Sequence, residues 1–252
     1  MARIIGIDLG SWTVKLTVLE GGFSRFETDS QHSKIVPQAD GNLPDLETRM
    51  GTLQDLLTEI DADENCLYGA GFPVDSASIR LVHMPFTDKN QIAQTLEFEV
   101  ESLVPYDLDD MTLSHRIVSS SPEGSGVLAA MAPKNQVQPY IYALSNAGAD
   151  PKSLIIDGDA LGAYGDGGTE AIIDIGHART VLTVTNGGQA VFSRGISLAG
   201  WHLTQALMRQ APGISFEEAE DRKHGARLST TTLAQWEDEE ATEAESSPST
   251  IA

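Results

Sequence analysis

The sequence is poor in cysteine, in basic residues and in long apolar runs. A single cysteine, Cys66, among 252 residues excludes an internal disulfide framework and fits a reducing compartment. Lysine and arginine number 16 against 37 aspartates and glutamates, and the formal net charge is −21. This acidity argues against nucleic acid and anionic membrane surfaces as main partners, because both are polyanions. No stretch approaches the ~20 apolar residues that span a bilayer, so we expect no membrane span in this chain.

The composition is otherwise that of a globular protein, with 40% apolar and 21% charged residues. Apolar side chains cluster as in buried strands at 3–9 and 14–19. The clearest predicted helix is 88–103, where Asp88 caps the start and Pro105 prevents the helix from continuing. The glycine-rich stretch 162–168 is predicted to form a hinge or linker. Residues 236–252 contain no basic residue and are predicted to be an acidic, disordered tail.

An internal repeat is the most informative feature of the sequence. Residues 8–22 read DLGSWTVKLTVLEGG and residues 174–188 read DIGHARTVLTVTNGG, which align without a gap at a constant offset of 166. Each copy follows an apolar strand, which we expect to be buried, and leads into a hairpin. Each also begins with an aspartate that a glycine follows two residues later.

This repeated pattern predicts a clamp for phosphates. A glycine lets the backbone turn sharply and exposes N–H groups to a phosphate, while a carboxylate at the end of a buried strand needs a cation or donors. Two such turns facing each other would hold a nucleotide phosphate chain, with Asp8 and Asp174 holding Mg²⁺ through waters. The alternative is that both aspartates only cap turns in two similar hairpins. That alternative explains one copy better than two copies in register.

The paired motifs resemble the two phosphate-binding hairpins of the actin, Hsp70 and sugar-kinase superfamily. Within it, IIGIDLGSWTVKLTVLE at 4–20 is similar to the first phosphate motif of the PilM-like proteins of type IV pili and the related GspL proteins of type II secretion. Residues 84–110 resemble the family's segment of a proline-phenylalanine pair, a glutamate-rich helix and a second proline before acids. Residues 171–207 resemble its second phosphate motif and the helix that follows.

The resemblance implies an actin-like α/β fold, with two related lobes around a nucleotide cleft and a small inserted subdomain. The first lobe would comprise 1–78 and 134–168, the inserted subdomain 79–133, and a partial second lobe 169–235. The family's adenosine-binding segment has no counterpart after Gly225, so we expect the C-terminal part of the fold to be incomplete.

The resemblance also implies the residues of the site. The implied phosphate-binding residues of the two loops are Asp8, Gly10, Ser11, Thr13, Lys15, Asp174, Gly176 and Thr180. The implied ligands are ATP and Mg²⁺, the metal being held by Asp8 and Asp174 through waters. His177 stands where the family commonly has a small residue, and could crowd the phosphates. No residue is a clear equivalent of a water-orienting group, and the one catalytic candidate is Asp157.

The function that the resemblance implies is a cytoplasmic scaffold at the cytoplasmic face of the bacterial inner membrane. Such a scaffold connects the assembly ATPase of a type II secretion or type IV pilus machine to the inner-membrane platform proteins, with ATP as a structural or switching ligand. We expect at most slow ATP hydrolysis, and the resemblance allows a homo-oligomer. Two alternatives stay open: an active ATP-dependent phosphotransferase or chaperone-like ATPase, and a degenerate interaction module that binds no nucleotide.

The predicted helix at 88–103 offers a second surface for a partner. Its apolar stripe is expected to pack into the inserted subdomain, whereas its acidic rim is a candidate docking surface for a basic partner. The partner-binding candidates are Glu97, Glu101 and Tyr106. The sequence has no P-loop, zinc-ligand spacing or serine-hydrolase elbow that would indicate another kind of site.

Overall fold

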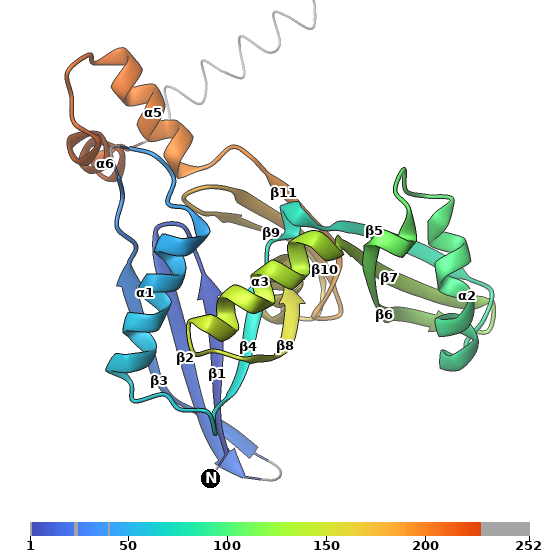
Figure 1. The fold of residues 1–252 in the computed structure, drawn as a ribbon. Coiled ribbons are helices and arrows are strands. Elements are labelled where there is room, and N and C mark those ends of the chain that lie inside the picture. Colours follow the sequence, from blue (N-terminus) through green and yellow to red (C-terminus); the bar gives the residue numbers. More distant parts are fainter. Residues whose placement is uncertain (1, 23–24, 40, 228–252) are drawn as a thin grey trace, which may run out of the picture. The chain divides into compact units, whose positions relative to one another are not determined.

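A computed structural model describes residues 2–22, 25–39 and 41–227. The chain divides into two compact units, residues 1–202 and residues 203–252, and the first unit holds three β-sheets (Figure 1). The acidic tail predicted at 236–252 lies outside the described residues, as do residues 228–235 of the predicted second lobe.

Five strands form the first sheet. In spatial order they are β3 (Arg25–Ile35), β2 (Thr13–Gly22), β1 (Ala2–Leu9), β4 (Leu67–Phe72) and β8 (Pro151–Ile156). β1, β2 and β3 are antiparallel neighbours, whereas β4 is parallel to both β1 and β8. Parallel neighbours need a crossover, and helices α1 (Leu46–Glu59) and α3 (Lys134–Asn146) lie in the connections that lead to β4 and β8.

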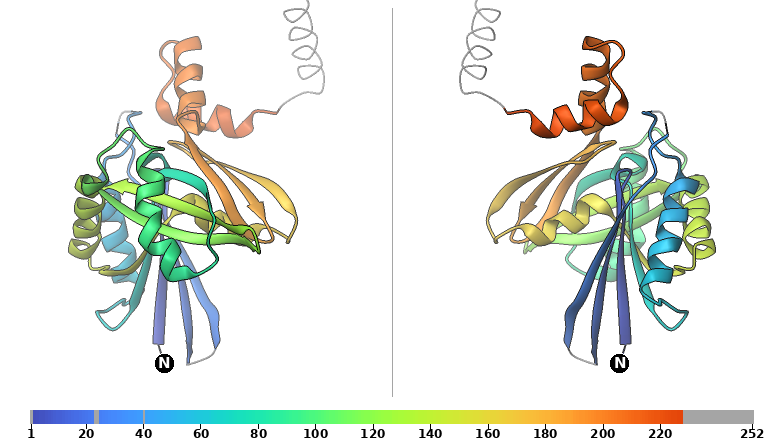
Figure 2. Two further views of the ribbon diagram at one scale, coloured as in Figure 1. Left: turned by 90° about the vertical axis from the view of Figure 1, so that its right-hand side faces the viewer. Right: turned by 90° about the vertical axis from the view of Figure 1, so that its left-hand side faces the viewer.

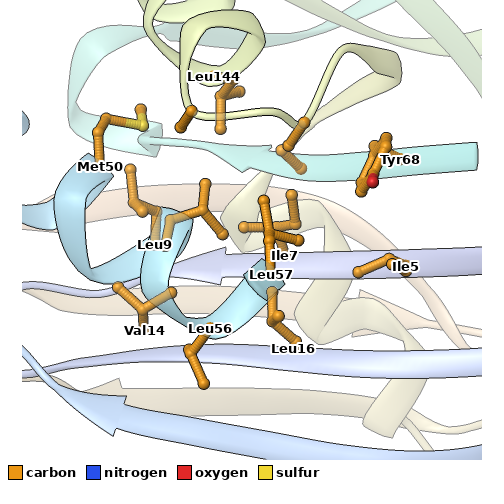
Figure 3. Close-up of a cluster of buried hydrophobic side chains, with 14 of the residues drawn as sticks. Ile5, Ile7, Leu9, Val14, Leu16, Met50, Leu56, Leu57, Tyr68 and Leu144 are labelled. Atoms are coloured by element: carbon orange, nitrogen blue, oxygen red, sulfur yellow. The ribbon is translucent and has the colours of Figure 1, made fainter. Parts of the chain in front are cut away.

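One face of the first sheet is the main hydrophobic core. The buried side chains of β1 and β2 on this face are Ile5, Ile7, Leu9, Val14, Leu16 and Val18. Helices α1 and α3 cover them with Met50, Leu53, Leu56, Leu57, Tyr140 and Leu144 (Figure 3). The apolar strands predicted from the sequence therefore hold the end of β1, where the first D-x-G turn begins, against a packed core.

The second sheet is antiparallel and has its own core. Its strands are β5 (Ser78–Met84), β7 (Gly124–Pro133) and β6 (Met111–Ser121), and α2 (Lys89–Glu101) packs Ile92, Leu96 and Val100 against them. Asp88 accepts hydrogen bonds from the N–H groups of Asn90 and Gln91, which confirms the predicted helix start. The predicted helix end is wrong by two residues. Leu103 lies past the end and is exposed, because the backbone before Pro105 disfavours helical geometry.

The third sheet has the order β11 (Gln189–Ile196), β10 (Thr180–Asn186), β9 (Thr169–Ile175) and is antiparallel. One face packs on α4 (Asp157–Ala160) and the 3-10 turn η3 (Leu161–Tyr164) (Figure 2). A Cβ on Gly158 would collide with Ser193 Oγ, and one on Gly162 would lie 2.7 Å from the backbone N of Ala190. The predicted hinge or linker at 162–168 is therefore wrong at Gly162, which lies in η3 and where glycine allows close packing rather than motion.

The opposite face of the third sheet is apolar and largely exposed. We call it the open face, and strand pairing assigns to it Ala171, Ile173, Ile175, Leu182, Val184, Phe192 and Ile196. Ile173 and Ile175 are 62% and 68% exposed. The expectation that the second D-x-G turn follows a buried strand is therefore wrong, because no described residue of the first unit covers this face of β9.

The described part of the second unit consists of the end of α5 (Gly200–Gln210) and of α6 (Phe216–Gly225). α6 begins with a capping box, in which the side chains of Ser215 and Glu218 accept from each other's backbone N–H. Lys223 Nζ donates to Glu220 and, at 3.0 Å, to Thr204 Oγ1, so a largely buried polar cluster joins the two helices. No helix among the described residues is long and apolar enough to cross a membrane.

Candidate functional site

The two D-x-G copies form the same turn. A Cβ on Gly10 would lie 2.5 Å from the carbonyl oxygen of Thr13, and one on Gly176 would lie 2.8 Å from that of Arg179. Thr13 and Arg179 are equivalent positions of the repeat. Any side chain at either glycine would press on the carbonyl three residues later, so both turns require glycine. The sequence repeat is thus also a repeat of backbone geometry.

The two turns lie against each other. The ring centroids of Trp12, in the first turn, and His177, in the second, are 4.9 Å apart. Lys15 Nζ donates to Asp8 Oδ2 at 3.1 Å. The Asp8 carboxylate, with a smaller contribution from Asp174, raises the pKa of Lys15. The structure therefore brings Asp8, Asp174 and Lys15 together from the two copies.

The Asp8–Lys15 pair is open to solvent. The two side chains are 62% and 61% exposed, and exposed ion pairs contribute little to stability. The ammonium can therefore exchange the carboxylate for an incoming phosphate at low cost. This arrangement can bind an anion without disturbing the fold.

Other predicted site residues serve to hold the turns. The Ser11 carbonyl accepts from Gln38 Nε2 at 3.0 Å, and the buried Thr180 hydroxyl donates to the Leu198 carbonyl at 2.6 Å. The N–H groups of Gly200 and Trp201 donate to the carbonyls of Gly176 and His177, at 3.0 and 2.8 Å. Thr180 and the start of α5 therefore fix the second turn, and the Thr180 hydroxyl is already engaged. Thr13 begins β2, directly after the first turn.

The sequence reasoning missed Arg179, which is the central cation of this region. Arg179 Nη2 donates to Asp157 Oδ2, and Arg179 Nε lies 3.7 Å from Asp75 Oδ1. Asp75 lies in the 3-10 turn η1 (Val74–Ser76) that follows β4, and Asp157 begins α4 after β8. The second turn is thereby tied to the ends of two parallel strands of the first sheet. The available signal was that Arg179 is the one arginine in the repeat.

Asp157 is held from three sides. Its Oδ1 accepts from the N–H groups of Val74 at 3.0 Å and Gly158 at 2.7 Å, while Oδ2 accepts from Arg179. Burial raises the pKa of Asp157, and Arg179 opposes this rise. Because both oxygens are engaged, this carboxylate links η1, α4 and the second turn.

Asp8 and Asp174 fit a hydrated magnesium ion. Both carboxylates are exposed at the ends of their strands, and Mg²⁺ keeps several waters when one or two carboxylates and substrate phosphates hold it. Among the described residues, no group of three or more His, Cys, Asp or Glu could hold a metal directly. The donor set therefore suits binding through waters, together with a phosphate ligand.

The predicted partner-binding residues lie apart from these turns, on and after α2. Glu97 and Glu101 are exposed on the helix, and Tyr106 is half exposed after it. Phe98, between the two glutamates, is 75% exposed. An exposed aromatic ring flanked by carboxylates is a surface that a partner can cover.

Comparison with known proteins identifies relatives over most of the chain. The family model described as type IV pilus assembly protein PilM matches residues 6–233. A solved structure of a PilM-PilN type IV pilus biogenesis complex has 19% sequence identity and a TM-score of 0.71, and the match covers 88% of this chain and 69% of that chain.

Two other solved structures are more distant. The cytoplasmic domain of Epsl, an inner-membrane component of the type II secretion system of Vibrio cholerae, matches with a TM-score of 0.52 and 9% identity, covering 90% of this chain and 97% of that chain. MreB5 of Spiroplasma citri bound to ADP matches with a TM-score of 0.44 and 20% identity, and the match covers 88% of this chain and 62% of that chain. The likeness to the first two structures confirms the predicted actin-like α/β class.

Proposed function

Because this chain belongs to the family of the type IV pilus assembly protein PilM, we propose that it is a cytoplasmic scaffold of a type IV pilus or type II secretion machine. The observation that carries the proposal is the family match over residues 6–233. The scaffold would lie at the cytoplasmic face of the bacterial inner membrane and connect the assembly ATPase to the inner-membrane platform proteins. The division into two lobes with an insertion at 79–133 belongs to the same proposal.

The ligand of the two turns in this proposal is ATP with Mg²⁺. Lys15 would leave Asp8 for the phosphates, and the close backbone at Gly10 and Gly176 would present N–H groups to them. Asp8 and Asp174 would hold the hydrated ion, whose positive charge offsets that of the phosphates. The support for this ligand is that the repeat places one cation and two exposed carboxylates between two glycine turns.

Removing the charges of the two turns is expected to weaken ATP binding. Asp8→Ala and Lys15→Ala should each raise the Kd for Mg-ATP about tenfold or more, because each removes a charged contact that is typically worth about 1.5–3 kcal/mol. Calorimetric titration of the purified chain measures this effect. Glu123→Ala, at an exposed position in the turn between β6 and β7, is the matched control and should titrate like wild type. A wild-type chain that fails to titrate would favour the interaction module that binds no nucleotide.

ATP turnover is expected to be slow. Asp157, the catalytic candidate, already accepts hydrogen bonds on both oxygens, so it is not free to orient an attacking water. Steady-state phosphate release with Mg-ATP should stay well below the ~10 s⁻¹ that is typical of enzymes. Rapid turnover that a substrate stimulates would contradict the scaffold proposal and favour the phosphotransferase or chaperone-like ATPase.

A further inference from the structure

The two copies of the repeat carry complementary side chains just after their turn glycines. At the offset of 166, Ser11 corresponds to His177 and Trp12 to Ala178. Each turn therefore has one large ring at a position where the other turn has a small side chain. The rings of Trp12 and His177 meet with their centroids 4.9 Å apart, within the range in which aromatic rings attract each other. This contact is a first link between the two turns.

The segment that follows β3 holds the first turn. The N–H of Val36 donates to the Trp12 carbonyl at 2.9 Å, and Gln38 Nε2 donates to the Ser11 carbonyl at 3.0 Å. The same segment contains Gly41, which is buried and has a φ of 74°, a left-handed conformation that favours glycine. This conformation fixes the direction in which the Gly41 carbonyl points.

Trp201 connects this segment to the second turn. Its indole Nε1 donates to the Gly41 carbonyl at 2.7 Å, and its backbone N–H donates to the His177 carbonyl at 2.8 Å. Trp201 is the second residue of α5 and is half-buried. Its side chain thus binds the support of the first turn, while its backbone binds the second turn. Trp201 is therefore a second link between the two turns, and it uses different atoms from the ring contact.

The two links and the two turns form a closed circuit. The circuit runs from the first turn through the segment after β3 to Trp201, on to the second turn, and back through the ring contact. In such a circuit, either link keeps the turns together when the other is broken. The distance between the turns is therefore set by contacts within the chain.

We propose that Trp201 and the Trp12–His177 pair, here called the clasp, position the two turns for their ligand. Trp201 is then a positioning residue, which acts through the turns that it holds. The role in binding rests on the proposed function, in which Mg-ATP lies between the turns. A site that is assembled in advance binds more tightly, because less of the binding free energy is used to order it. Opening the clasp lowers the fraction of chains that can bind, and the apparent affinity falls by that fraction.

Loss of both links should weaken Mg-ATP binding more than the two single losses together. Trp201→Phe removes the Nε1 donor but keeps a ring, and His177→Ala removes the ring contact. Each substitution alone should raise the Kd for Mg-ATP no more than about threefold, because the other link still holds the turns. The double variant should raise it about tenfold or more, which exceeds the product of the single effects. Calorimetric titration of the full chain measures these values.

His115→Ala is the matched control for the histidine substitution. His115 is exposed on β6, outside both turns, so this variant should titrate like wild type.

Hydrogen exchange tests the clasp without nucleotide. The N–H groups of Val36 and Trp201 donate to the carbonyls of the first and second turn, so their protection reports whether the turns are held. In the ligand-free double variant, both groups should exchange about tenfold faster or more than in wild type. The N–H of Ile5, in the middle of β1, should exchange as in wild type if the fold is intact. Saturating Mg-ATP should restore the protection, because the ligand then holds the turns.

The outcomes separate the clasp from the proposed ligand. A double variant whose Kd rises by no more than the product of the single effects, or unchanged exchange at Val36 and Trp201, would overturn the clasp. A His177→Ala chain that binds Mg-ATP more tightly than wild type would also overturn it, because His177 would then crowd the phosphates. A wild-type chain that binds no Mg-ATP overturns the proposed ligand instead, and faster exchange in the double variant would still show that the clasp holds the turns.

Discussion

Ile7→Ala should lower the free energy of unfolding by about 3–4 kcal/mol, whereas Ile173→Ala should lower it by no more than about 1 kcal/mol. The two isoleucines each lie one residue before the repeat, at the same offset of 166, so the chemical change and the strand context are matched. Ile7 is buried under α1, and its truncation leaves a cavity, while Ile173 already faces solvent. Urea unfolding followed by far-UV circular dichroism, at concentrations where the chain is monomeric, measures both values.

Leu16 and Leu182 repeat this comparison on the neighbouring strands. Leu16→Ala should again lower the free energy of unfolding several times more than Leu182→Ala, because Leu16 is fully buried and Leu182 is not. If the two substitutions of either pair lower the free energy of unfolding equally, the open face is covered in the monomer. That outcome would contradict the exposure of Ile173 and Ile175 in this structure.

Arg179→Ala should lower the free energy of unfolding by about 3 kcal/mol at pH 7, since removing one member of a largely buried ion pair leaves the other charge uncompensated. Asp157 and Arg179 are 24% and 27% exposed, so solvent replaces the lost contact poorly. Lys15→Ala is the matched control. It removes a cation from an exposed pair in the first turn and should cost less than about 1 kcal/mol.

The cost of Arg179→Ala should depend on pH. Burial raises the pKa of Asp157, and without Arg179 it rises further above the unfolded value of about 4. A group whose folded pKa is raised contributes stability that is present below the unfolded pKa and is lost as the pH rises through the folded pKa. The deficit of the variant against wild type should therefore be largest at pH 7 and shrink toward pH 4. A deficit that does not change with pH would show that Asp157 is not the charge left unpaired.

Local rules made part of the site predictable. The two glycine turns can be recognised in the sequence because each requires glycine at one defined position. The N-terminal caps of α2 and α6 can be recognised because the capping side chain and the N–H group that it accepts from are three residues apart. The Asp8–Lys15 pair follows from an antiparallel hairpin in which these two residues face each other across the strands. Each of these features depends on residues that are close along the chain.

The features that sequence reasoning missed depend on distant parts of the chain. Arg179 meets Asp75 and Asp157 only after the third sheet has packed against the first, and no spacing rule connects these residues. The apolar pattern of β9 resembles that of β1, but whether a strand is buried depends on the elements that cover it. The glycine-rich stretch from Gly162 predicts a hinge or linker, because a glycine that permits close packing and one that permits motion are alike in sequence.

The place of β8 in the first sheet sets an order for synthesis. β8 pairs with β4 in parallel, yet the whole second sheet and α3 are made between them. Residues 73–150 must therefore leave the ribosome before β8 can complete the first sheet. Helix α3 lies near the end of this segment, so its side chains also reach the core late. The second sheet has local, antiparallel pairings and its own core, so it can fold during this interval. Until then β4 has an unpaired edge, and an unpaired strand edge is open to pairing with other chains.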